Sequence, residues 1–401
     1  MRGSQNPGHD PASDAAPSPV ESRSNPSRPL RGIRLVEFAG LGPTPFAAMM
    51  LADMGAEIIR IERAWPPRDL PGDPGFDFLR RGRPAIVVDL KSPEGRAHAI
   101  ELIGAADILL EGYRPGVMER LGLGPDAMTA LRPQLIYARM TGWGQHGPLA
   151  HRAGHDINYL AMTGGLEMIG DADRAPPPPI NFLGDYGGGA MFVVAGILAA
   201  LIERHSSGKG QVVDAAMIDG TSMLMTQIFA WSAMGAWRPE RGSNLLDGGA
   251  YFYRCYETSD SRYIAVGALE PQFHDALLTG LGLDPAEFPD RTNRVHWAER
   301  GARLAAIFRT ATRDEWIERL SPYDACVSPV LSAAEAVTHP ANTARNVHEV
   351  TPLGVQPAPA PRLSRTPFQL SEMPGEPGPE ARPRLLEWGF SPDLVDRIVS
   401  A

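Results

Sequence analysis

The chain has 401 residues, of which 43% are hydrophobic and 21% are charged, and this composition predicts a soluble, globular protein with two domains. The net charge of −9 argues against general binding to nucleic acids or anionic membranes, and the nearest candidate for a membrane span, residues 190–202, is too short. The two cysteines, Cys255 and Cys326, indicate neither a disulfide scaffold nor a thiolate metal site, so we expect a reducing, cytoplasmic location.

Residues 1–29 are predicted to be a disordered leader. They are rich in Pro, Ser, Asn and Asp and contain few large apolar side chains, so they cannot bury enough surface to become ordered. They also lack an apolar signal segment and an Arg-rich amphipathic helix, which disfavours organelle import. We exclude this segment from the predicted fold.

Residues 32–140 alternate between predicted strands and helices. A strand at 32–39 ends in a turn at 40–43, and a helix at 46–54 and a strand at 57–61 follow it. Further strands at 85–90, 107–111 and 135–140, with a helix at 93–104, continue the pattern. This alternation predicts a doubly wound α/β domain with a parallel sheet, because right-handed crossovers place helices on the sheet faces.

The pattern changes in the second half of the chain. An apolar helix at 191–202, a short strand at 212–216 and a second apolar helix from 220 to about 237 come first. Strands at 251–256 and 263–266 and helices at about 271–282 and 302–310 then predict a smaller α+β domain over about 245–330. The proline-rich segment 357–383 is predicted to run extended over the surface.

The first strand is followed by a glycine pair that partly matches a dinucleotide-binding fingerprint. Gly40 and Gly42 follow the strand, and Glu62 ends the next strand about twenty residues later. However, Pro45 occupies the third glycine position and Arg63 immediately follows the acid. We therefore interpret the glycines as a tight strand-to-helix turn.

Two residues that stand among glycines offer acid and base chemistry. His155 lies in Gly-His-Asp-Ile-Asn-Tyr (154–159), and Asp185 lies in Gly-Asp-Tyr-Gly-Gly-Gly (184–189). An imidazole can take up a proton near neutral pH and a carboxylic acid can return one, so the pair suits proton transfer on both sides of a carbon acid.

Each of the two residues has an alternative interpretation. His155 alone is more typical of a structural histidine, and its spacing from His151 suits a metal only on a helix, which the nearby Gly and Pro residues disfavour. We predict no metal site. Asp185 could instead be the N-cap of the following helix. The helix dipole would then lower the pKa of Asp185. A neutral carboxylic acid at this position would therefore require burial to raise that pKa.

Basic residues occur at or after the ends of the predicted strands, where open α/β sheets bind ligands. They are Arg63, Lys91, Arg114 and Arg120. Arginine and lysine suit the phosphates of coenzyme A, while the alternative interpretation is solvated surface charge.

Six motifs occur in a fixed order along the chain. They are Val-Val-Asp-Leu-Lys (87–91), Glu-Gly-Tyr-Arg-Pro-Gly-Val-Met-Glu-Arg-Leu-Gly (111–122), Ala-Arg-Met-Thr-Gly-Trp-Gly-Gln (138–145), the segments at 154–159 and 184–189, and Ser-Gly-Lys-Gly-Gln-Val-Val-Asp-Ala-Ala-Met (207–217). Through these motifs the chain resembles the class III coenzyme A transferase superfamily, and within it the α-methylacyl-CoA racemase branch, from about residue 32 to 366.

The resemblance implies an architecture and a set of site residues. A large Rossmann-like domain would comprise 30–220 and 331–390, a linker helix 221–244 and a small domain 245–330, in a homodimer of interlocked subunits with active sites between them. His155, Asp185 and Glu270 would be catalytic, with Glu270 orienting the histidine from the partner subunit. The implied contacts to coenzyme A come from Arg63, Val88, Asp89, Leu90, Lys91, Gly112, Tyr113, Arg114, Arg120, Gly154, Asp156, Ile157, Asn158 and Tyr159.

The resemblance also implies a reaction, the 1,1-proton transfer that inverts a 2-methylacyl-CoA thioester through a planar enolate, with no cofactor beyond the coenzyme A of the substrate. His155 would be the base and Asp185 the acid for the S enantiomer, and the roles would exchange for R. One alternative is a coenzyme A transferase of the same fold, in which a carboxylate near Asp156 attacks the thioester. A non-catalytic acyl-CoA-binding homologue is the other, but it would lack the acid or the base.

Overall fold

The computed structural model describes residues 28–63 and 74–400. The predicted leader at 1–29 therefore lies, apart from its last two residues, outside the described residues.

The large domain is built on a six-stranded parallel sheet. Its strands are β1 (Arg34–Phe38), β2 (Glu57–Glu62), β3 (Ala85–Val87), β4 (Ile108–Glu111), β5 (Ile136–Thr141) and β6 (Val212–Ala216). They lie in the order β3-β2-β1-β4-β5-β6, and every neighbouring pair is parallel. This is the Rossmann order, and it confirms the predicted doubly wound α/β sheet. Its switch point lies between β1 and β4, where crossovers leave toward opposite faces and open a crevice at the carboxyl edge.

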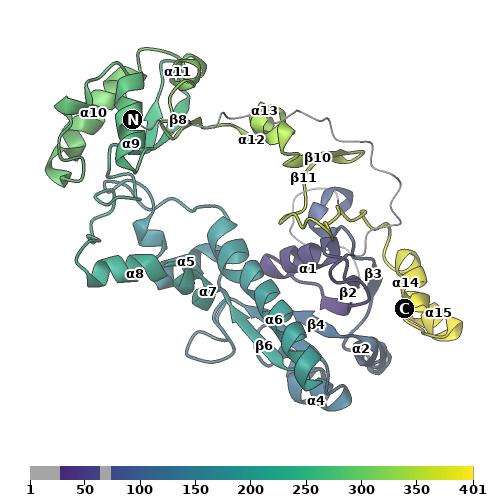
Figure 1. Cartoon of the computed structure of the whole chain (residues 1–401). Coiled ribbons are helices and arrows are strands. Elements are labelled where there is room, and N and C mark those ends of the chain that lie inside the picture. Colours follow the sequence, from purple (N-terminus) through teal and green to yellow (C-terminus); the bar gives the residue numbers. More distant parts are fainter. Residues whose placement is uncertain (1–27, 64–73, 401) are drawn as a thin grey trace, which may run out of the picture.

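Helices cover both faces of this sheet (Figure 1). On one face, α1 (Pro43–Asp53) and α6 (Met191–Ser207) pack on side chains such as Leu35 of β1. On the other, α2 (Pro93–Ala105), α4 (Pro125–Leu131), α14 (Arg382–Glu387) and α15 (Pro392–Val399) pack on side chains such as Val36. Successive residues of a strand point to opposite faces, so one buried strand supplies both cores. The last helices of the chain thus complete the domain that its first strands begin.

The smaller domain has an antiparallel sheet and its own core. Strands β7 (Tyr253–Glu257), β8 (Tyr263–Gly267) and β9 (Val327–Pro329) lie in sequence order. Helices α9 (Pro271–Gly280), α10 (Trp297–Phe308) and α11 (Arg313–Leu320) pack against them around Phe252, Leu277 and Phe308. The predicted α+β character is confirmed, although α11 and β9 were not predicted as elements.

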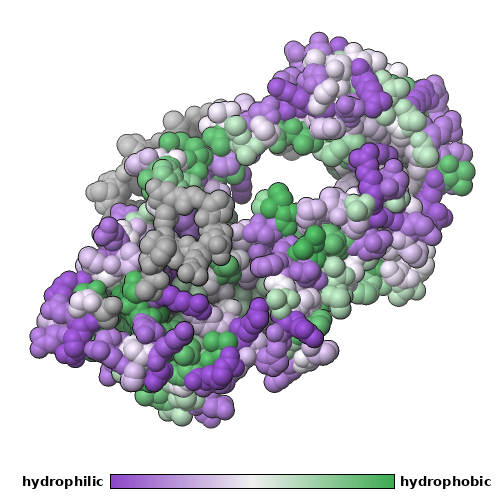
Figure 2. Space-filling model, turned by 180° about the vertical axis from the view of Figure 1, so that it is seen from behind, coloured by the Kyte–Doolittle hydropathy of each residue, from purple (hydrophilic) through white to green (hydrophobic). Residues whose placement is uncertain are grey.

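Two connections join the domains and leave an opening between them. The chain leaves through α7 (Met217–Leu224) and α8 (Thr226–Ala233) and returns through α12 (Ala333–Thr338), α13 (Pro340–Ala344) and the hairpin of β10 (His348–Thr351) and β11 (Gly354–Pro357). Figure 1 shows these connections on opposite sides, and Figure 2 shows that side chains do not fill the space between them. The chain therefore has the shape of a ring.

Several predicted elements differ from the structure. The single helix predicted from 220 to about 237 is two helices, α7 and α8, which meet at Met225. Helix α1 begins at Pro43 rather than at residue 46, because proline fits the first turn of a helix. Residues 182–190, predicted to precede the helix at 191–202, are themselves a π-helix, η4 (Phe182–Ala190), that continues into α6.

The apolar segment predicted at 190–202 is part of a longer continuous helix, from Phe182 to Ser207, which includes the glycines before it. It has 26 residues and a mean hydropathy of 1.7 over its most apolar window, so its length and composition alone would allow it to span a membrane. One side, with Val193 and Ile197, is buried against β5 and β6, which identifies it as a helix of the large domain core. The other side exposes Met191 and Ile202.

Candidate active site

His155 stands at the first turn of α5 (Asp156–Thr163), beyond the carboxyl end of β5. It is the N-cap residue, with an extended backbone, and its N–H donates to Oδ1 of Asn158 at 3.0 Å. The side chain of His155 is exposed. The helix start therefore fixes the backbone of the predicted base and leaves its imidazole free for a ligand.

Aromatic packing holds the chain that leads to His155. The hydroxyl of Tyr159 donates to the carbonyl of Gly154 at 2.5 Å, and its ring meets Trp143 edge-on with centroids 4.7 Å apart. A Cβ at Gly142 would lie 2.1 Å from Cζ of Tyr159, so only glycine fits beneath this ring. Tyr159, expected to contact coenzyme A, thus also supports the loop of the base.

Asp185 lies within η4, and the prediction that it is a helix N-cap is wrong. The helix begins after Asn181 and runs through the glycines, because this helix and α7 approach closely. A Cβ at Gly220 would lie 1.8 Å from the carbonyl oxygen of Gly188, and one at Gly188 would lie 2.4 Å from Oγ1 of Thr221. The glycines therefore allow close backbone contact between η4 and α7.

The carboxyl group of Asp185 lies over the turn that follows β1, at the switch point of the sheet. A Cβ at Gly42, whose φ is 67°, would lie 2.9 Å from Oδ2 of Asp185. Burial, strengthened by the negative charge of Asp156, raises the pKa of Asp185 to about 6, although a hydrogen bond from Asn181 and the charge of His155 oppose the shift. The burial that the sequence required for a neutral acid is therefore present, and His155 is close enough to affect its titration.

The neighbouring carboxylate, Asp156, faces the backbone of η4. Its Oδ1 accepts a hydrogen bond from the N–H of Asp185 at 2.6 Å, and the N–H of Gly184 also bonds to this side chain. A Cβ at Gly184 would lie 2.4 Å from the same oxygen. Burial raises the pKa of Asp156 as well. The structure thus brings His155, Asp156 and Asp185 together.

The predicted contacts to coenzyme A follow the same edge of the sheet. Arg63 after β2 is exposed, with its guanidinium 5.9 Å from the ring centroid of Tyr113 in the loop after β4. Arg114 is exposed and affects the pKa of Tyr159, which burial raises to about 12 and the arginine lowers. Arg120 ends the short helix α3 (Val117–Arg120) and is also exposed. These exposed cations follow β2 and β4 at the carboxyl edge of the sheet.

The loop after β3 carries the remaining predicted contacts. Asp89 and Lys91 are exposed, and Oδ1 of Asp89 accepts the N–H of Lys91 at 2.9 Å. The side chain of Val88 is only 1% exposed and packs in the core with Leu90 partly buried beside it, so Val88 can offer a ligand only its backbone. Gly112 lies against α1, where a Cβ would be 2.5 Å from Oγ1 of Thr44. On α5, Ile157 is 41% exposed.

A buried charge cluster that the sequence analysis did not identify supports the loop after β4. Arg139 on β5 donates through Nε to Glu111 at 2.8 Å and through a terminal nitrogen to Glu119 at 2.7 Å. The second carboxylate oxygen of Glu111 accepts the N–H of Tyr113 at 2.7 Å. Glu111 is fully buried, and this burial raises its pKa. Charged residues inside otherwise apolar strands, at 111 and 139, were the signal available in the sequence.

The structure does not bring Glu270 to His155. Glu270 is the exposed N-cap of α9 in the small domain, and its charge contributes to raising the pKa of the Cys326 thiol. Figure 1 places α9 in the small domain and α5 in the large domain. In the described part of the chain no hydrogen bond or ion pair of Glu270 with His155 is present.

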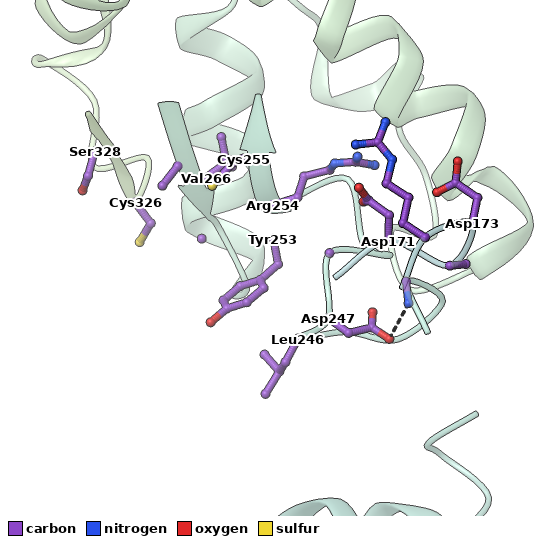
Figure 3. A pocket seen from close by; sticks show the side chains of 16 residues that line it. Asp171, Asp173, Leu246, Asp247, Tyr253, Arg254, Cys255, Val266, Cys326 and Ser328 are labelled. Atoms are coloured by element: carbon purple, nitrogen blue, oxygen red, sulfur yellow. Dashed lines mark hydrogen bonds between the residues drawn. The ribbon is translucent and has the colours of Figure 1, made fainter. Parts of the chain in front are cut away.

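A wide cavity of about 1000 Å³ lies on the small domain, away from His155 and Asp185. One sheet face with Tyr253, Cys255 and Cys326 forms part of its wall, and loops around Asp171 and Asp247 adjoin it (Figure 3). Both cysteines are free and exposed. Within residues 28–63 and 74–400, no group of three or more His, Cys, Asp or Glu side chains is arranged to hold a metal ion.

Comparisons with known proteins place these features in one family. The model of CoA-transferase family III matches residues 30–387. The chain is 44% identical to the α-methylacyl-CoA racemase of Mus musculus, in a match that covers 93% of this chain and 98% of the relative. It is 42% identical to the α-methylacyl-CoA racemase of Homo sapiens, in a match that covers 92% of this chain and 96% of the relative. A CAIB/BAIF family protein from Brucella suis has a similar crystal structure, with a TM-score of 0.75 and 28% identity over 90% of this chain and 99% of that one. The predicted resemblance is confirmed.

Proposed function

We propose that this chain, which belongs to CoA-transferase family III, is a racemase that inverts the α-carbon of 2-methylacyl-CoA thioesters. The observation that carries the proposal is the juxtaposition of His155 and Asp185, which come from different elements and meet at the switch point of the sheet. Burial raises the pKa of Asp185 to about 6, so part of this carboxyl is protonated near neutral pH, and the exposed imidazole of His155 lies beside it. Such a pair suits the exchange of a proton between two faces of one carbon.

The two side chains would divide the reaction between them. With the S enantiomer, His155 removes the α-proton and Asp185 returns one to the opposite face, and with the R enantiomer the roles exchange. A carboxylic acid with a pKa of about 6 is a better proton donor near neutral pH than an ordinary aspartate, because more of it is protonated there. The transfer is a pure proton exchange, so atoms and electrons balance without an oxidant.

The start of α5 supplies partners for the enolate oxygen. The N–H groups of Asp156 and Ile157, at the first two positions of this helix, have no acceptor among the described residues. They stand directly beside His155 at the positive end of the helix dipole. A thioester oxygen placed there would receive hydrogen bonds as negative charge develops on it during proton removal.

The coenzyme A moiety would lie along the carboxyl edge of the sheet. From the acid and base at the switch point, the loops after β4, β2 and β3 present Arg114, Arg63 and Lys91. A guanidinium can bind a phosphate through two parallel hydrogen bonds, and an ammonium acts as a point charge. This arrangement would hold the anionic end of the substrate outside and direct the thioester toward His155.

A coenzyme A transferase is the alternative, and the presence of Asp156 beside His155 is the observation in its favour. A transferase would need this carboxylate to attack the thioester carbon. Here its Oδ1 accepts the backbone N–H of Asp185 at 2.6 Å, so the carboxylate is held against η4 and its charge is partly satisfied there. The geometry therefore favours proton transfer over acyl transfer.

The racemase would act as an interlocked homodimer in which Glu270 of the partner subunit orients His155. Glu270 is exposed at the start of α9 in the small domain, whereas His155 stands at the start of α5 in the large domain. Large apolar side chains are exposed on α6, α7 and α8, including Met191 at 46%, Met223 at 66% and Phe229 at 54%. An apolar surface of this kind is typical of contact between subunits.

Co-expression of two inactive variants tests this assembly. In one subunit His155→Ala removes the base, and in the other Glu270→Gln removes the orienting carboxylate. If Glu270 acts across the interface, a mixed dimer contains one site with both native residues, and activity returns to about half of the wild-type value per dimer. If it acts within its own chain, both sites stay impaired. A monomer in analytical ultracentrifugation would contradict the assembly itself.

The experiment that tests the reaction is proton NMR of the purified protein with one enantiomer of a 2-methylacyl-CoA in deuterium oxide, without an acceptor acid. The proposal predicts loss of the α-proton signal and formation of both epimers. His155→Ala should abolish exchange from one enantiomer at least. Absence of exchange, followed by thioester transfer once succinate or another carboxylate is added, would identify a transferase with Asp156 as the nucleophile.

A further inference from the structure

We propose that Asp156 is a positioning residue, whose carboxylate binds η4 to the start of α5 and thereby fixes Asp185 opposite His155. This inference rests on the proposed racemase function and adds a role for a third side chain of the site. In this role Asp156 contacts the backbone that carries the acid, and it neither attacks the substrate nor exchanges a proton with it.

The geometry of the contact carries the inference. Oδ1 of Asp156 accepts the N–H of Asp185 at 2.6 Å, and the N–H of Gly184 donates to the same side chain. A Cβ at Gly184 would lie 2.4 Å from Oδ1 and 2.8 Å from Cγ of Asp156, so the carboxylate lies directly on the glycine backbone. The contact thus requires an acceptor oxygen at position 156 on α5 and a glycine on η4 at the same time.

The sequence order explains why this contact sets the distance between acid and base. Asp156 immediately follows His155, and the backbone N–H that it binds belongs to Asp185 itself. One hydrogen bond therefore joins the residue next to the base to the residue that is the acid. The two segments are otherwise 29 positions apart in the sequence and belong to different helices.

The charge of Asp156 adds a second effect on the same acid. After burial, this negative charge is the main cause that raises the pKa of Asp185, while His155 and the hydrogen bond from Asn181 lower it. The other titratable groups whose charges interact with Asp185 are Tyr159 on α5 and Tyr186 on η4. Within the described residues, no charged side chain of α1, α6 or α7 contributes to this shift. Removal of the charge, with the acceptor oxygen retained, should therefore make Asp185 more acidic without moving it.

Two substitutions separate the position from the charge. Asp156→Asn keeps an oxygen that can accept the N–H of Asp185 but has no negative charge, and Asp156→Ala removes both. Asp126→Asn, which neutralises an exposed carboxylate in the first turn of α4, is the matched control. Initial rates of epimer formation from the R enantiomer of a 2-methylacyl-CoA would be measured by chiral chromatography from pH 5 to 8.5, together with the melting temperature of each variant.

The positioning role predicts distinct results for the two variants. For Asp156→Asn, kcat at pH 8 should stay within about threefold of the wild-type value, and the acid limb of kcat/KM should move to lower pH by about one unit. For Asp156→Ala, kcat should fall about tenfold or more across the whole range, with little change in KM. The Asp126→Asn control should match the wild type in all of these values.

Other outcomes would overturn the inference. A folded Asp156→Asn variant without activity would mean that the carboxylate itself takes part in the chemistry. An unchanged pH profile together with full activity of Asp156→Ala would mean that the contact has no role in the reaction. Should Asp156→Ala fail to fold, the Asn variant still decides the question. Absence of epimer formation by the wild-type protein would instead refute the proposed function and is distinguishable from both results.

Discussion

The pH dependence of racemization follows from the environment of Asp185. With the R enantiomer Asp185 is the base and must be ionised, and below its pKa this carboxylate takes up a proton and can no longer remove the α-proton. Activity is therefore lost as the pH falls through the pKa of Asp185. The loss should therefore appear in the reaction of the R enantiomer, in which Asp185 is the base.

The structure gives the size of the effect. With a pKa of about 6, Asp185 is about nine-tenths ionised at pH 7 and about one-tenth ionised at pH 5, so kcat/KM should fall about tenfold between these values. An aspartate with the usual pKa of 3.8 would still be about nine-tenths ionised at pH 5 and would produce almost no loss. At pH 5 the ionised fraction of Asp185 therefore differs by nearly a factor of ten between the two cases.

The assay is the initial rate of epimer formation from each enantiomer at substrate concentrations far below KM, from pH 4.5 to 8. Inhibition by free coenzyme A over the same range is the control, because it reports any pH dependence that comes from the phosphates of the ligand. A profile for the R enantiomer that stays flat down to pH 5, or a midpoint near 4, would refute the argument that burial and Asp156 hold the pKa of Asp185 high.

Three further substitutions test the surroundings of the site. Arg139→Leu leaves Glu111 buried without its partner and should lower the free energy of unfolding in urea by about 3 kcal/mol or more at pH 8. The loss of unfolding free energy should be smaller at pH 5, because burial raises the pKa of Glu111 and the carboxylate then takes up a proton. An equal loss at both pH values would contradict this reasoning. Gly184→Ala would place a Cβ 2.4 Å from Oδ1 of Asp156 and should reduce kcat about tenfold or more, whereas Gly104→Ala on α2, with its nearest neighbour at 3.9 Å, should leave kcat unchanged. Arg114→Ala should raise KM for the thioester more at low than at high salt, and a salt-independent change would argue against a phosphate contact.

The sequence was sufficient to predict the large sheet. Alternating apolar strands and helices in residues 32–140 allow few topologies, because crossovers between parallel strands are right-handed and short. The sheet order with a switch point between β1 and β4 agrees with this expectation. The single helix predicted at 220–237 is two helices in the structure. The apolar residues have the same helical spacing before and after Met225, so the sequence pattern did not show the break there.

The glycines around Asp185 could not be interpreted correctly from their sequence. Glycine is a poor helix former, so Gly187–Gly189 indicated a loop before a helix. In the folded chain α7 approaches so closely that a side chain at Gly188 would meet Thr221, and the lost helix propensity is outweighed by packing. Contacts between residues more than thirty positions apart decided the local structure here.

The sequence by itself determined the chemical inventory of this protein: an imidazole at His155, carboxyls at Asp156 and Asp185, and cations after the strands. These features depend on residue identity and local order, which motifs record directly. Only the tertiary structure decided how the groups act together. The raised pKa of Asp185 and the hydrogen bond from its backbone to Asp156 depend on elements that are remote in sequence, because burial and hydrogen-bond geometry arise only when those elements pack.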